Sequence, residues 1–266
     1  MELLRKVWSF ARLPGGMGGT KGALPQPEHT LYVIGDVHGR VDLLDQLIDR
    51  IHQDIAAHAP PEPAIVLVGD YIDRGDDSAA VLNRVIELHK AQTVPTICLF
   101  GNHEEMMLRF LDTPSYGPMW LRNGGLQTLA SYGIGGITPA SDKDTLSEAA
   151  KQLREILGAE QERWLRNRDF TYQSGNVVVV HAALDPEREV DEQTEDAMLW
   201  GHTEFARRPR TDGICVVHGH TIVDQAEVLP GRIPVDTGAV FTGRLTAAVL
   251  VPEQEARFLQ TGAGGR

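Results

Sequence analysis

The sequence predicts a single α/β domain that carries a helical insertion, and three observations lead to this prediction. Over residues 31–111, short apolar runs alternate with amphipathic segments, which is the β-α-β-α-β rhythm of a sheet joined by right-handed crossovers. Over residues 112–168, helix candidates punctuated by Gly and Pro replace that rhythm. Over residues 170–251, apolar strand candidates return.

The domain boundaries follow from local composition. Residues 1–29 include Pro14-Gly-Gly-Met-Gly-Gly19 and are expected to form a flexible N-terminal arm. Residues 30–252 form the domain, with the insertion at about 112–168, and residues 253–266 form a C-terminal tail.

The overall composition is that of a soluble globular protein, with 42% hydrophobic and 23% charged residues in a chain of 266. The formal net charge of -12 argues against a large surface for nucleic acid or for an anionic membrane. No apolar run is long enough to cross a bilayer, and the first ten residues make a poor signal peptide. Cys98 and Cys215 lie in apolar strand candidates and are expected to be buried thiols, so we expect a cytoplasmic protein.

The first half of the domain predicts three strands and three helices in alternation. The first helix has its apolar residues at helical spacing, and Asp77 or Ser78 can cap the second. The strand candidates are 31–34, 65–68 and 96–100, and the helix candidates are 41–55, 78–88 and 105–111.

The second half begins with the insertion, which has helix candidates at 119–132 and 146–166 and is expected to form a cap beside the site. A β-hairpin follows, because two apolar runs flank the turn Ser174-Gly-Asn176. The remaining strand candidates are 214–217, 226–229, 233–235 and 245–251.

Polar side chains follow five of the predicted strands. The first three strands run into Gly35-Asp-Val-His-Gly39, Gly69-Asp-Tyr-Ile-Asp-Arg-Gly75 and Gly101-Asn-His-Glu104, and two later strands end near His181 and His220. The carboxyl ends of parallel strands meet at one edge of a sheet, so these side chains are expected to converge. Carboxylate, amide and imidazole groups together are a ligand set for divalent metals.

This pattern favours a two-metal phosphoester hydrolase. Two divalent cations neutralise a phosphoester dianion and activate a bridging water for in-line attack. Asp70 lies on the middle one of the first three strands and is expected to bridge the two metals. Asp36 and His38 would complete one metal site, and Asn102, His181 and His220 would complete the other. Taken singly, Asp36, Asp70 and Asn102 could be helix caps or turn residues; their combination with the histidines favours ligands.

The same motifs resemble those of the phosphoprotein phosphatase branch of the calcineurin-like metallophosphoesterases, particularly the bacterial and phage-lambda-like serine/threonine protein phosphatases. The resemblance rests on Gly35–Gly39, Gly69–Gly75, Gly101–Glu104, His181-Ala-Ala and Gly219-His-Thr221, which stand in the family's order. Softer matches at Trp120–Gly125, Leu199-Trp200 and Val235–Ala239 extend it over most of the chain after His29.

The resemblance implies a four-layer α/β/β/α sandwich of two mixed sheets and the metal assignment given above. It also implies that His103 is the general acid for the leaving oxygen, oriented by Asp73, and that Arg74 and Asn102 contact the substrate phosphate. A histidine can donate a proton near neutral pH, and an arginine can bind phosphate oxygens with two parallel hydrogen bonds. The two metals would be manganese by resemblance, although iron or zinc would fit the same ligands.

The branches of the family differ at positions that this sequence shows. Ile222 stands where many broader metallophosphoesterases have a further ligand histidine, as the phosphatase branch allows. Asp73 is present, whereas the dinucleoside-tetraphosphate hydrolases tend to replace it. We therefore expect a phosphoprotein or a small phosphomonoester as substrate. The alternatives are a dinucleoside polyphosphate or nucleotide hydrolase and an inactive metal-binding scaffold.

One position departs from the family pattern. The lambda-like phosphatases have a phosphate-binding arginine two residues after a Leu-Trp pair, and here that residue is His202. Either His202 contacts the substrate phosphate in a pH-dependent way, or Arg207 or Arg208 replaces the missing charge.

Several nearby residues are given structural roles. Glu104 and Glu105 open a helix, where negative charge is favourable, and they are assigned no chemistry. Trp120 is expected to pack within the insertion, and His218 is expected to be structural or to orient a ligand.

Overall fold

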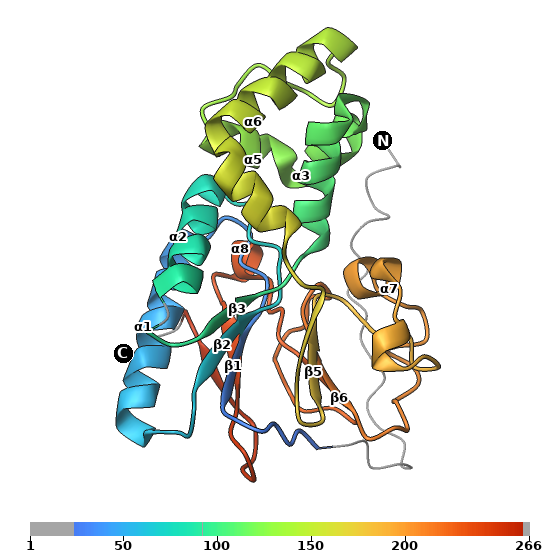
Figure 1. Ribbon diagram of the computed structural model, residues 1–266. Coiled ribbons are helices and arrows are strands. Elements are labelled where there is room, and N and C mark those ends of the chain that lie inside the picture. Colours follow the sequence, from blue (N-terminus) through green and yellow to red (C-terminus); the bar gives the residue numbers. More distant parts are fainter. Residues whose placement is uncertain (1–23, 92, 263–266) are drawn as a thin grey trace.

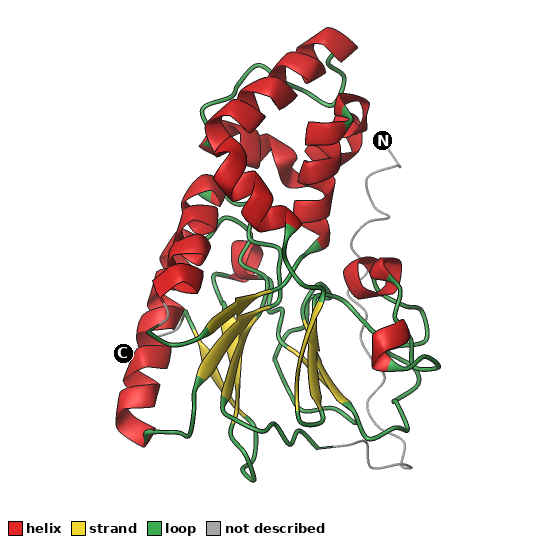
Figure 2. Cartoon of the chain, in the orientation of Figure 1, coloured by secondary structure: helices red, strands yellow, loops and turns green. Residues whose placement is uncertain are grey.

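The protein is described by a computed structural model that covers residues 24–91 and 93–262 (Figure 1). The arm predicted for residues 1–29 therefore falls mostly outside the described residues. Two mixed β-sheets lie face to face at the centre of the molecule, and helices cover their outer faces (Figure 2).

The larger sheet has five strands in the order β3-β2-β1-β8-β9. The first three strands run parallel to one another, and the last two are antiparallel additions. The helices α1 (Val41–His58) and α2 (Ser78–Ala91) form the crossovers, as the sequence rhythm predicted. The strands are β1 (Leu31–Ile34), β2 (Ala64–Leu67), β3 (Thr96–Cys98), β8 (Thr246–Leu250) and β9 (Arg257–Gln260).

The smaller sheet has four strands in the order β4-β5-β6-β7. β4 and β5 form the predicted antiparallel hairpin, β6 pairs parallel to β5, and β7 pairs parallel to β6. The short helix α7 (Glu195–Trp200) and a 3-10 turn, η3 (Val190–Glu192), follow β5. The strands are β4 (Thr171–Ser174), β5 (Val177–Val180), β6 (Cys215–His218) and β7 (Arg232–Pro234).

Three apolar cores account for a four-layer arrangement. Strand side chains alternate between the two faces of a sheet, so β1 sends Tyr32 and Ile34 toward the helices and Leu31 and Val33 toward the second sheet. The inter-sheet core also contains Cys215, which is fully buried, as predicted. A third, smaller core lies between the outer face of β5–β6 and α7. The expected α/β/β/α sandwich is confirmed.

The insertion forms a helical cap above the carboxyl ends of the strands (Figure 1). The helix predicted at 119–132 is divided into several short elements, because Gly124 has a φ of 111° and interrupts the helical geometry. The cap consists of α3 (Asn102–Asp112), η1 (Pro114–Tyr116), α4 (Gly117–Trp120), η2 (Leu121–Gly125), α5 (Leu126–Ser131) and α6 (Lys143–Arg166).

Three boundary predictions were wrong. The tail predicted to begin at residue 253 contains β9, which is the edge strand of the larger sheet. Residues 24–29, which were predicted as part of the flexible arm, contact the β4–β5 hairpin, where Gln26 N donates to Asn176 Oδ1 at 2.6 Å. Residues 226–229 form no strand, since only Leu229 pairs there, across a tight turn at Pro230 and Gly231.

A last short helix, α8 (Ala239–Thr242), lies between β7 and β8. It is flanked at both ends by glycines with positive φ. No helix among the described residues is long and apolar enough to cross a membrane.

Candidate metal centre

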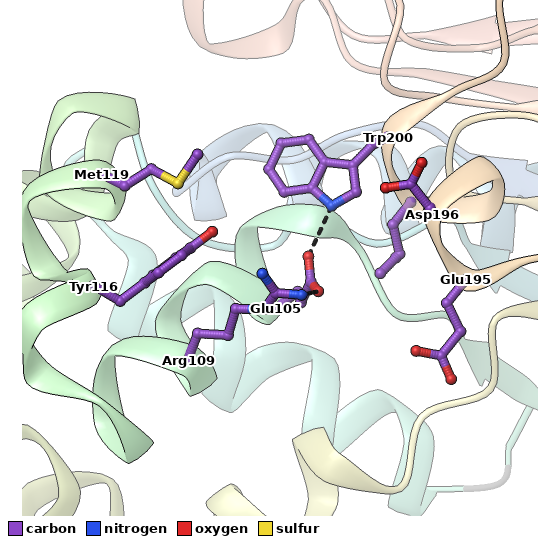
Figure 3. Close-up of a pocket in the computed structure, with 8 residues that line it drawn as sticks. Glu105, Arg109, Tyr116, Met119, Glu195, Asp196 and Trp200 are labelled. Carbon is purple, nitrogen blue, oxygen red and sulfur yellow. Dashed lines mark hydrogen bonds and ion pairs between the residues drawn. The ribbon is translucent and has the colours of Figure 1, made fainter.

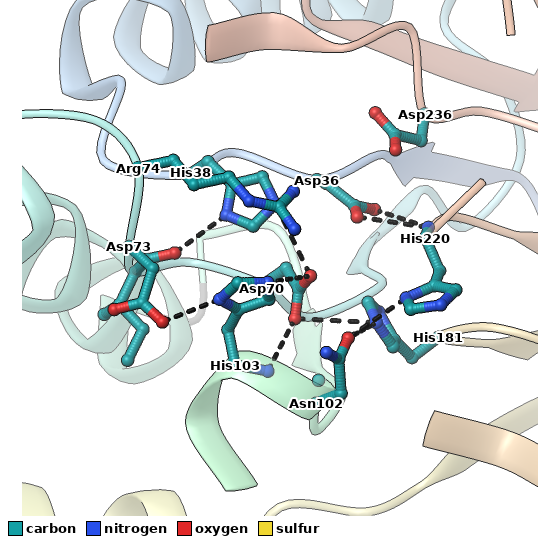
Figure 4. Close-up of polar contacts among 12 residues, drawn as sticks. Asp36, His38, Asp70, Asp73, Arg74, Asn102, His103, His181, His220 and Asp236 are labelled. Atoms are coloured by element: carbon teal, nitrogen blue, oxygen red, sulfur yellow. Dashed lines mark hydrogen bonds and ion pairs between the residues drawn. The ribbon is translucent and has the colours of Figure 1, made fainter. Parts of the chain in front are cut away.

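Loops from the carboxyl ends of five strands meet at one edge of the sandwich, under the cap (Figure 4). The expectation that these strand ends converge is met for every predicted ligand, and all of them are buried or nearly so. The residues are Asp36 and His38 after β1, Asp70, Asp73 and Arg74 after β2, Asn102 and His103 after β3, His181 after β5, and His220 after β6.

Two groups of possible ligands share the Asp70 carboxylate. The donor atoms of His38, Asp70 and His103 lie within 4.8 Å of one another, and so do those of Asp70, His181 and His220. The shared position of Asp70 is the one that a bridging ligand requires. His103 appears in the first group in place of the expected Asp36, because its Nε2 lies 3.9 Å from Asp70 Oδ2.

Asp36 is directed at the same region from the opposite side. Both of its carboxylate oxygens accept a hydrogen bond from His220 N at 3.1 Å. Gly219 leaves the room for this contact, because a Cβ there would lie 2.0 Å from Asp36 Oδ1. Asp36 thus joins the loop that carries His220 to the first strand end.

The ring nitrogens of two histidines are oriented as metal ligands are. His38 Nδ1 lies 2.8 Å from the Ile72 carbonyl, and His181 Nδ1 lies 3.2 Å from the Val68 carbonyl. A neutral imidazole that donates from Nδ1 keeps its Nε2 lone pair for the centre. His181 Nε2 then faces Asn102 Oδ1 at 2.8 Å. When His181 Nε2 carries no proton, a cation beside this pair of atoms would bind both of them.

The pKa values of the site residues also favour a metal site. Burial lowers the pKa of His38 and His181 and lowers that of His220 to about 3, so these imidazoles are neutral. Burial and the neighbouring Asp236 raise the pKa of the Asp36 carboxyl well above its usual value. Burial also raises the pKa of Asp236 to about 6.

Buried carboxylates are stable when a cation balances them or when they take up a proton, and a cation keeps them ionised beside neutral imidazoles. The residues present therefore fit divalent metal ions. Asp236 was not singled out in the sequence, because the match at Val235–Ala239 identified a family segment rather than a charge near Asp36.

The backbone at the centre is held in an uncommon conformation. Among the described residues, eight that are not glycine have positive φ. Five of these belong to the site: His38, Asp70, Asp73, Arg74 and His220. Such conformations cost roughly 1–3 kcal/mol each and persist where the surroundings impose them. Their concentration here indicates that the loops are shaped for the side chains that they present.

The buried carboxylate of Glu104 holds two of these loops in place. It accepts from Asp70 N at 2.9 Å, Tyr71 N at 2.9 Å, Gly101 N at 3.1 Å and Ile72 N at 3.4 Å. Burial, followed by the charge of Asp70, raises the pKa of Glu104 to about 8. The helix-terminus role expected for Glu104 was incomplete, because its main contacts are with the β2 loop.

The candidate acid, His103, is paired with Asp73. His103 Nδ1 lies 2.6 Å from Asp73 Oδ2, and both side chains are buried. Trp120 Nε1 donates to the same carboxylate at 2.9 and 3.1 Å, and Thr128 Oγ1 donates to it at 2.6 Å. Trp120 is fully buried, as predicted, but no sequence pattern indicated that it and Thr128 reach Asp73 from the cap.

Arg74 lies over the first group of ligands. Its Nη1 is 2.7 Å from His38 Nε2, and its backbone N donates to the Gly124 carbonyl of the cap at 3.3 Å. The guanidinium therefore reaches the region where a substrate phosphate would bind.

His202 is not brought into the cluster by any contact among the described residues. Its Nε2 lies 3.8 Å from Asp185 Oδ2, and its side chain is 31% exposed. Arg207 pairs with Glu204, and Arg208 pairs with Glu187, so both arginines engage surface carboxylates. His218 is buried against Phe205, with its Nδ1 at the Gly219 carbonyl, in keeping with a structural role.

Comparison with known families settles the classification. The family model for calcineurin-like phosphoesterases matches residues 29–224, a span that contains every candidate ligand. The chain belongs to this family. As a member of this phosphoesterase family it is a hydrolase of phosphoester bonds, and the family is metal-dependent.

The relatives carry two kinds of name. The chain is 28% identical over 245 residues to an asymmetrical bis(5'-nucleosyl)-tetraphosphatase PrpE of Oceanobacillus iheyensis, covering 84% of this chain and 89% of the relative. It is also 28% identical over 229 residues to serine/threonine-protein phosphatase 1 of Salmonella typhimurium, covering 82% and 90%. A crystal structure of a protein provisionally named a diadenosine tetraphosphatase has the same fold, with a TM-score of 0.58, 21% identity, and coverage of 92% of this chain and 100% of that chain.

Proposed function

We propose that this protein is a metal-dependent phosphomonoester hydrolase, most consistent with a serine/threonine-type protein phosphatase. The observation that carries the proposal is the buried His103–Asp73 pair beside the shared carboxylate Asp70. It provides a proton donor next to the place where a phosphate would be held.

In this proposal Asp36, His38 and Asp70 hold one divalent ion, and Asp70, Asn102, His181 and His220 hold the other. Such ions, when bound, supply an activated water and neutralise the charge of the phosphate. The ligand set of oxygen and nitrogen donors suits manganese, and iron or zinc also fits it.

The residues of this chain then perform three tasks. Arg74 binds the phosphate oxygens through its planar guanidinium, and the Asn102 side chain lies where it can contact them too. His103 Nε2 donates a proton to the leaving oxygen. Asp73 accepts from Nδ1 of His103, so it fixes the ring and stabilises the imidazolium form before transfer.

The need for an acid distinguishes the candidate substrates. A serine or threonine alkoxide is a strong base and leaves only with a proton, whereas a nucleoside polyphosphate is a weakly basic leaving group. The side chains that hold Asp73, which are Trp120 and Thr128 in the cap, would be of little use for a leaving group that departs unprotonated. This argument favours the phosphomonoester.

A dinucleoside polyphosphate hydrolase is the second candidate, because relatives covering more than four fifths of this chain carry the name bis(5'-nucleosyl)-tetraphosphatase.

The test is hydrolysis by the chelator-stripped protein after manganese is added. A phosphoserine peptide, a phosphotyrosine peptide, p-nitrophenyl phosphate and diadenosine tetraphosphate are compared at equal concentration. Phosphate release from the monoesters that requires manganese supports the proposal. Preferential cleavage of the dinucleotide replaces it with the second candidate.

A further inference from the structure

A pocket of about 440 Å³ opens between the cap and α7 (Figure 3). Glu105 and Arg109 of α3, with Tyr116 and Met119 beyond them, line one side. Residues of α7, ending at Trp200, line the other.

Both sides of this pocket extend from segments that carry candidate ligands. α3 begins with Asn102 and His103, so Glu105 stands in the same helical turn as the candidate acid. α7 is tied to the other ligand segment, because Ala182 N, next to His181, donates to the Met198 carbonyl at 2.8 Å. A group attached to a phosphate at the metal centre would therefore lie close to the pocket.

Some polar side chains that line the pocket already have partners within the protein. Glu105 Oε1 pairs with Arg109 Nη2 at 2.7 Å, and Glu105 Oε2 accepts from Trp200 Nε1 at 2.8 Å. The Arg109 guanidinium also lies 5.5 Å from the centre of the Tyr116 ring. These contacts hold the walls in position and neutralise Arg109, so this arginine is not free to attract an anion.

Other side chains that line the pocket have polar groups or ring faces without such partners among the described residues. Within residues 24–91 and 93–262, the exposed carboxylates of Glu195 and Asp196 form no ion pair and accept no side-chain hydrogen bond. The Trp200 side chain is 37% exposed, and no ring or cation of the described chain stacks on it. The pocket thus combines two free negative charges with an open indole face.

We propose that this pocket binds the cationic side chain of an arginine or lysine close to the phosphorylated residue of a peptide substrate. The aliphatic or guanidinium part would lie on Trp200, and the charge would lie near Glu195 and Asp196. The inference rests on the proposed phosphatase function and names its substrate class. Additional phosphates of a dinucleoside polyphosphate would instead approach the two free carboxylates and be repelled.

The experiment uses the full chain with manganese and a set of phosphopeptides in an alanine background. Arginine is placed at each of the four positions on either side of the phosphorylated residue, and kcat/KM is divided by that of the all-alanine peptide. At one position, or two adjacent ones, we expect a ratio of about fivefold to tenfold, mainly through KM. Citrulline at that position, which keeps the shape and removes the charge, should return the ratio to about one.

The decisive variants are Glu195→Gln/Asp196→Asn and Trp200→Leu. Each ratio is taken within a single variant, so a change in overall turnover does not affect it. The double variant should lower the ratio to below about twofold, and Trp200→Leu should reduce it in part. The matched control is Glu253→Gln/Glu255→Gln, which makes the same change in net charge on exposed residues of the β8–β9 turn and should leave the ratio unchanged.

Two outcomes overturn the inference alone: a ratio near one at every position in a protein that hydrolyses p-nitrophenyl phosphate, and an arginine preference that survives the double variant. Diadenosine tetraphosphate bound more tightly by the wild type than by Trp200→Leu would assign the open indole to a base instead. Failure to hydrolyse any monoester, including p-nitrophenyl phosphate, would overturn the proposed function and the inference with it.

Discussion

Glu104 and Glu105 are adjacent in α3, and they belong to two very different regions. Glu104 is fully buried and accepts four backbone N–H groups from the loops that shape the metal centre. Glu105 points into the pocket beside α7, and among the described residues the side-chain partners of its carboxylate are Arg109 and Trp200. The Glu104 carboxylate holds the main chain of two loops in place, whereas the Glu105 carboxylate holds side chains at the surface.

Under the proposed function, this difference separates the residues assigned to the reaction from those assigned to the rest of the substrate. The metal centre is buried, rich in positive-φ residues and braced through main-chain contacts, so it tolerates little change. The pocket is exposed and carries free charges, so its residues can change at small cost to the fold. Four predictions, which use five variants, test this contrast from the largest expected effect to the smallest.

Asp70→Asn removes the carboxylate that both ligand groups share. We expect the rate of phosphomonoester hydrolysis to fall by about a thousandfold or more, because one side chain serves both metal positions. Manganese should raise the Tm of the wild type by binding only the folded state, and it should raise that of Asp70→Asn much less. Calorimetry with and without manganese measures this effect.

The control for Asp70→Asn is Asp45→Asn, which changes an exposed carboxylate paired with Arg84. A full manganese response in Asp70→Asn would contradict the bridging position.

His103→Asn tests the acid within the same region. The kcat for a phosphoserine peptide should fall about 10²–10⁴-fold, the usual contribution of a general acid. The loss for p-nitrophenyl phosphate should be smaller, because p-nitrophenolate is a weaker base and needs less protonation. Equal losses on the two substrates would speak against proton donation.

Glu104→Gln and Glu105→Gln compare the two regions directly. A glutamine at position 104 turns an amide toward backbone N–H donors, so two of them lose their acceptor and the free energy of unfolding should fall by about 2–3 kcal/mol. Glu105→Gln removes contacts to partly exposed side chains and should cost less than about 1 kcal/mol.

Urea unfolding of the chelated proteins measures both glutamine variants without a contribution from metal binding. Equal losses of stability would contradict the distinction between a main-chain brace and a surface contact.

His202→Arg should have the smallest effect. If His202 contacts the substrate phosphate, an arginine that stays charged will flatten the dependence of kcat/KM on pH between about 6 and 8 and raise it at most a few-fold. Unchanged kinetics across this range would remove His202 from the site. His52→Arg is the control, since it makes the same substitution at an exposed position of α1.

The sequence predicted that the candidate ligands converge, because each of them follows a recognisable strand within a few residues. Within the run from Leu31 to His38, the apolar residues predict the strand, and the candidate ligands follow directly after it. The residues that support the centre could not be found in this way. Trp120 and Thr128 reach Asp73 across 47 and 55 positions of sequence, and no local pattern marks such contacts.

The errors in the fold have similar causes. β9 begins after a charged turn at 253–255, and its pairing with β8 is a tertiary contact that a short, half-buried strand does not reveal. The break at Gly124 divides a helix that the apolar spacing alone predicts as continuous. Glu104 was assigned to the helix dipole because its sequence position fits that role, whereas the backbone N–H groups that donate to its carboxylate belong to another loop.

The hydrogen bond from Trp120 to Asp73 also bears on how such enzymes can be recombined. The cap contributes Trp120 and Thr128 to the carboxylate that orients the candidate acid, so it is not an independent module placed over a finished active site. A chimaera that received the cap of another family member would inherit new substrate contacts and, at the same time, a new environment for Asp73. A cap exchange made to change substrate specificity would therefore also alter the contacts of Asp73, unless the tryptophan and the threonine are kept in the chimaera.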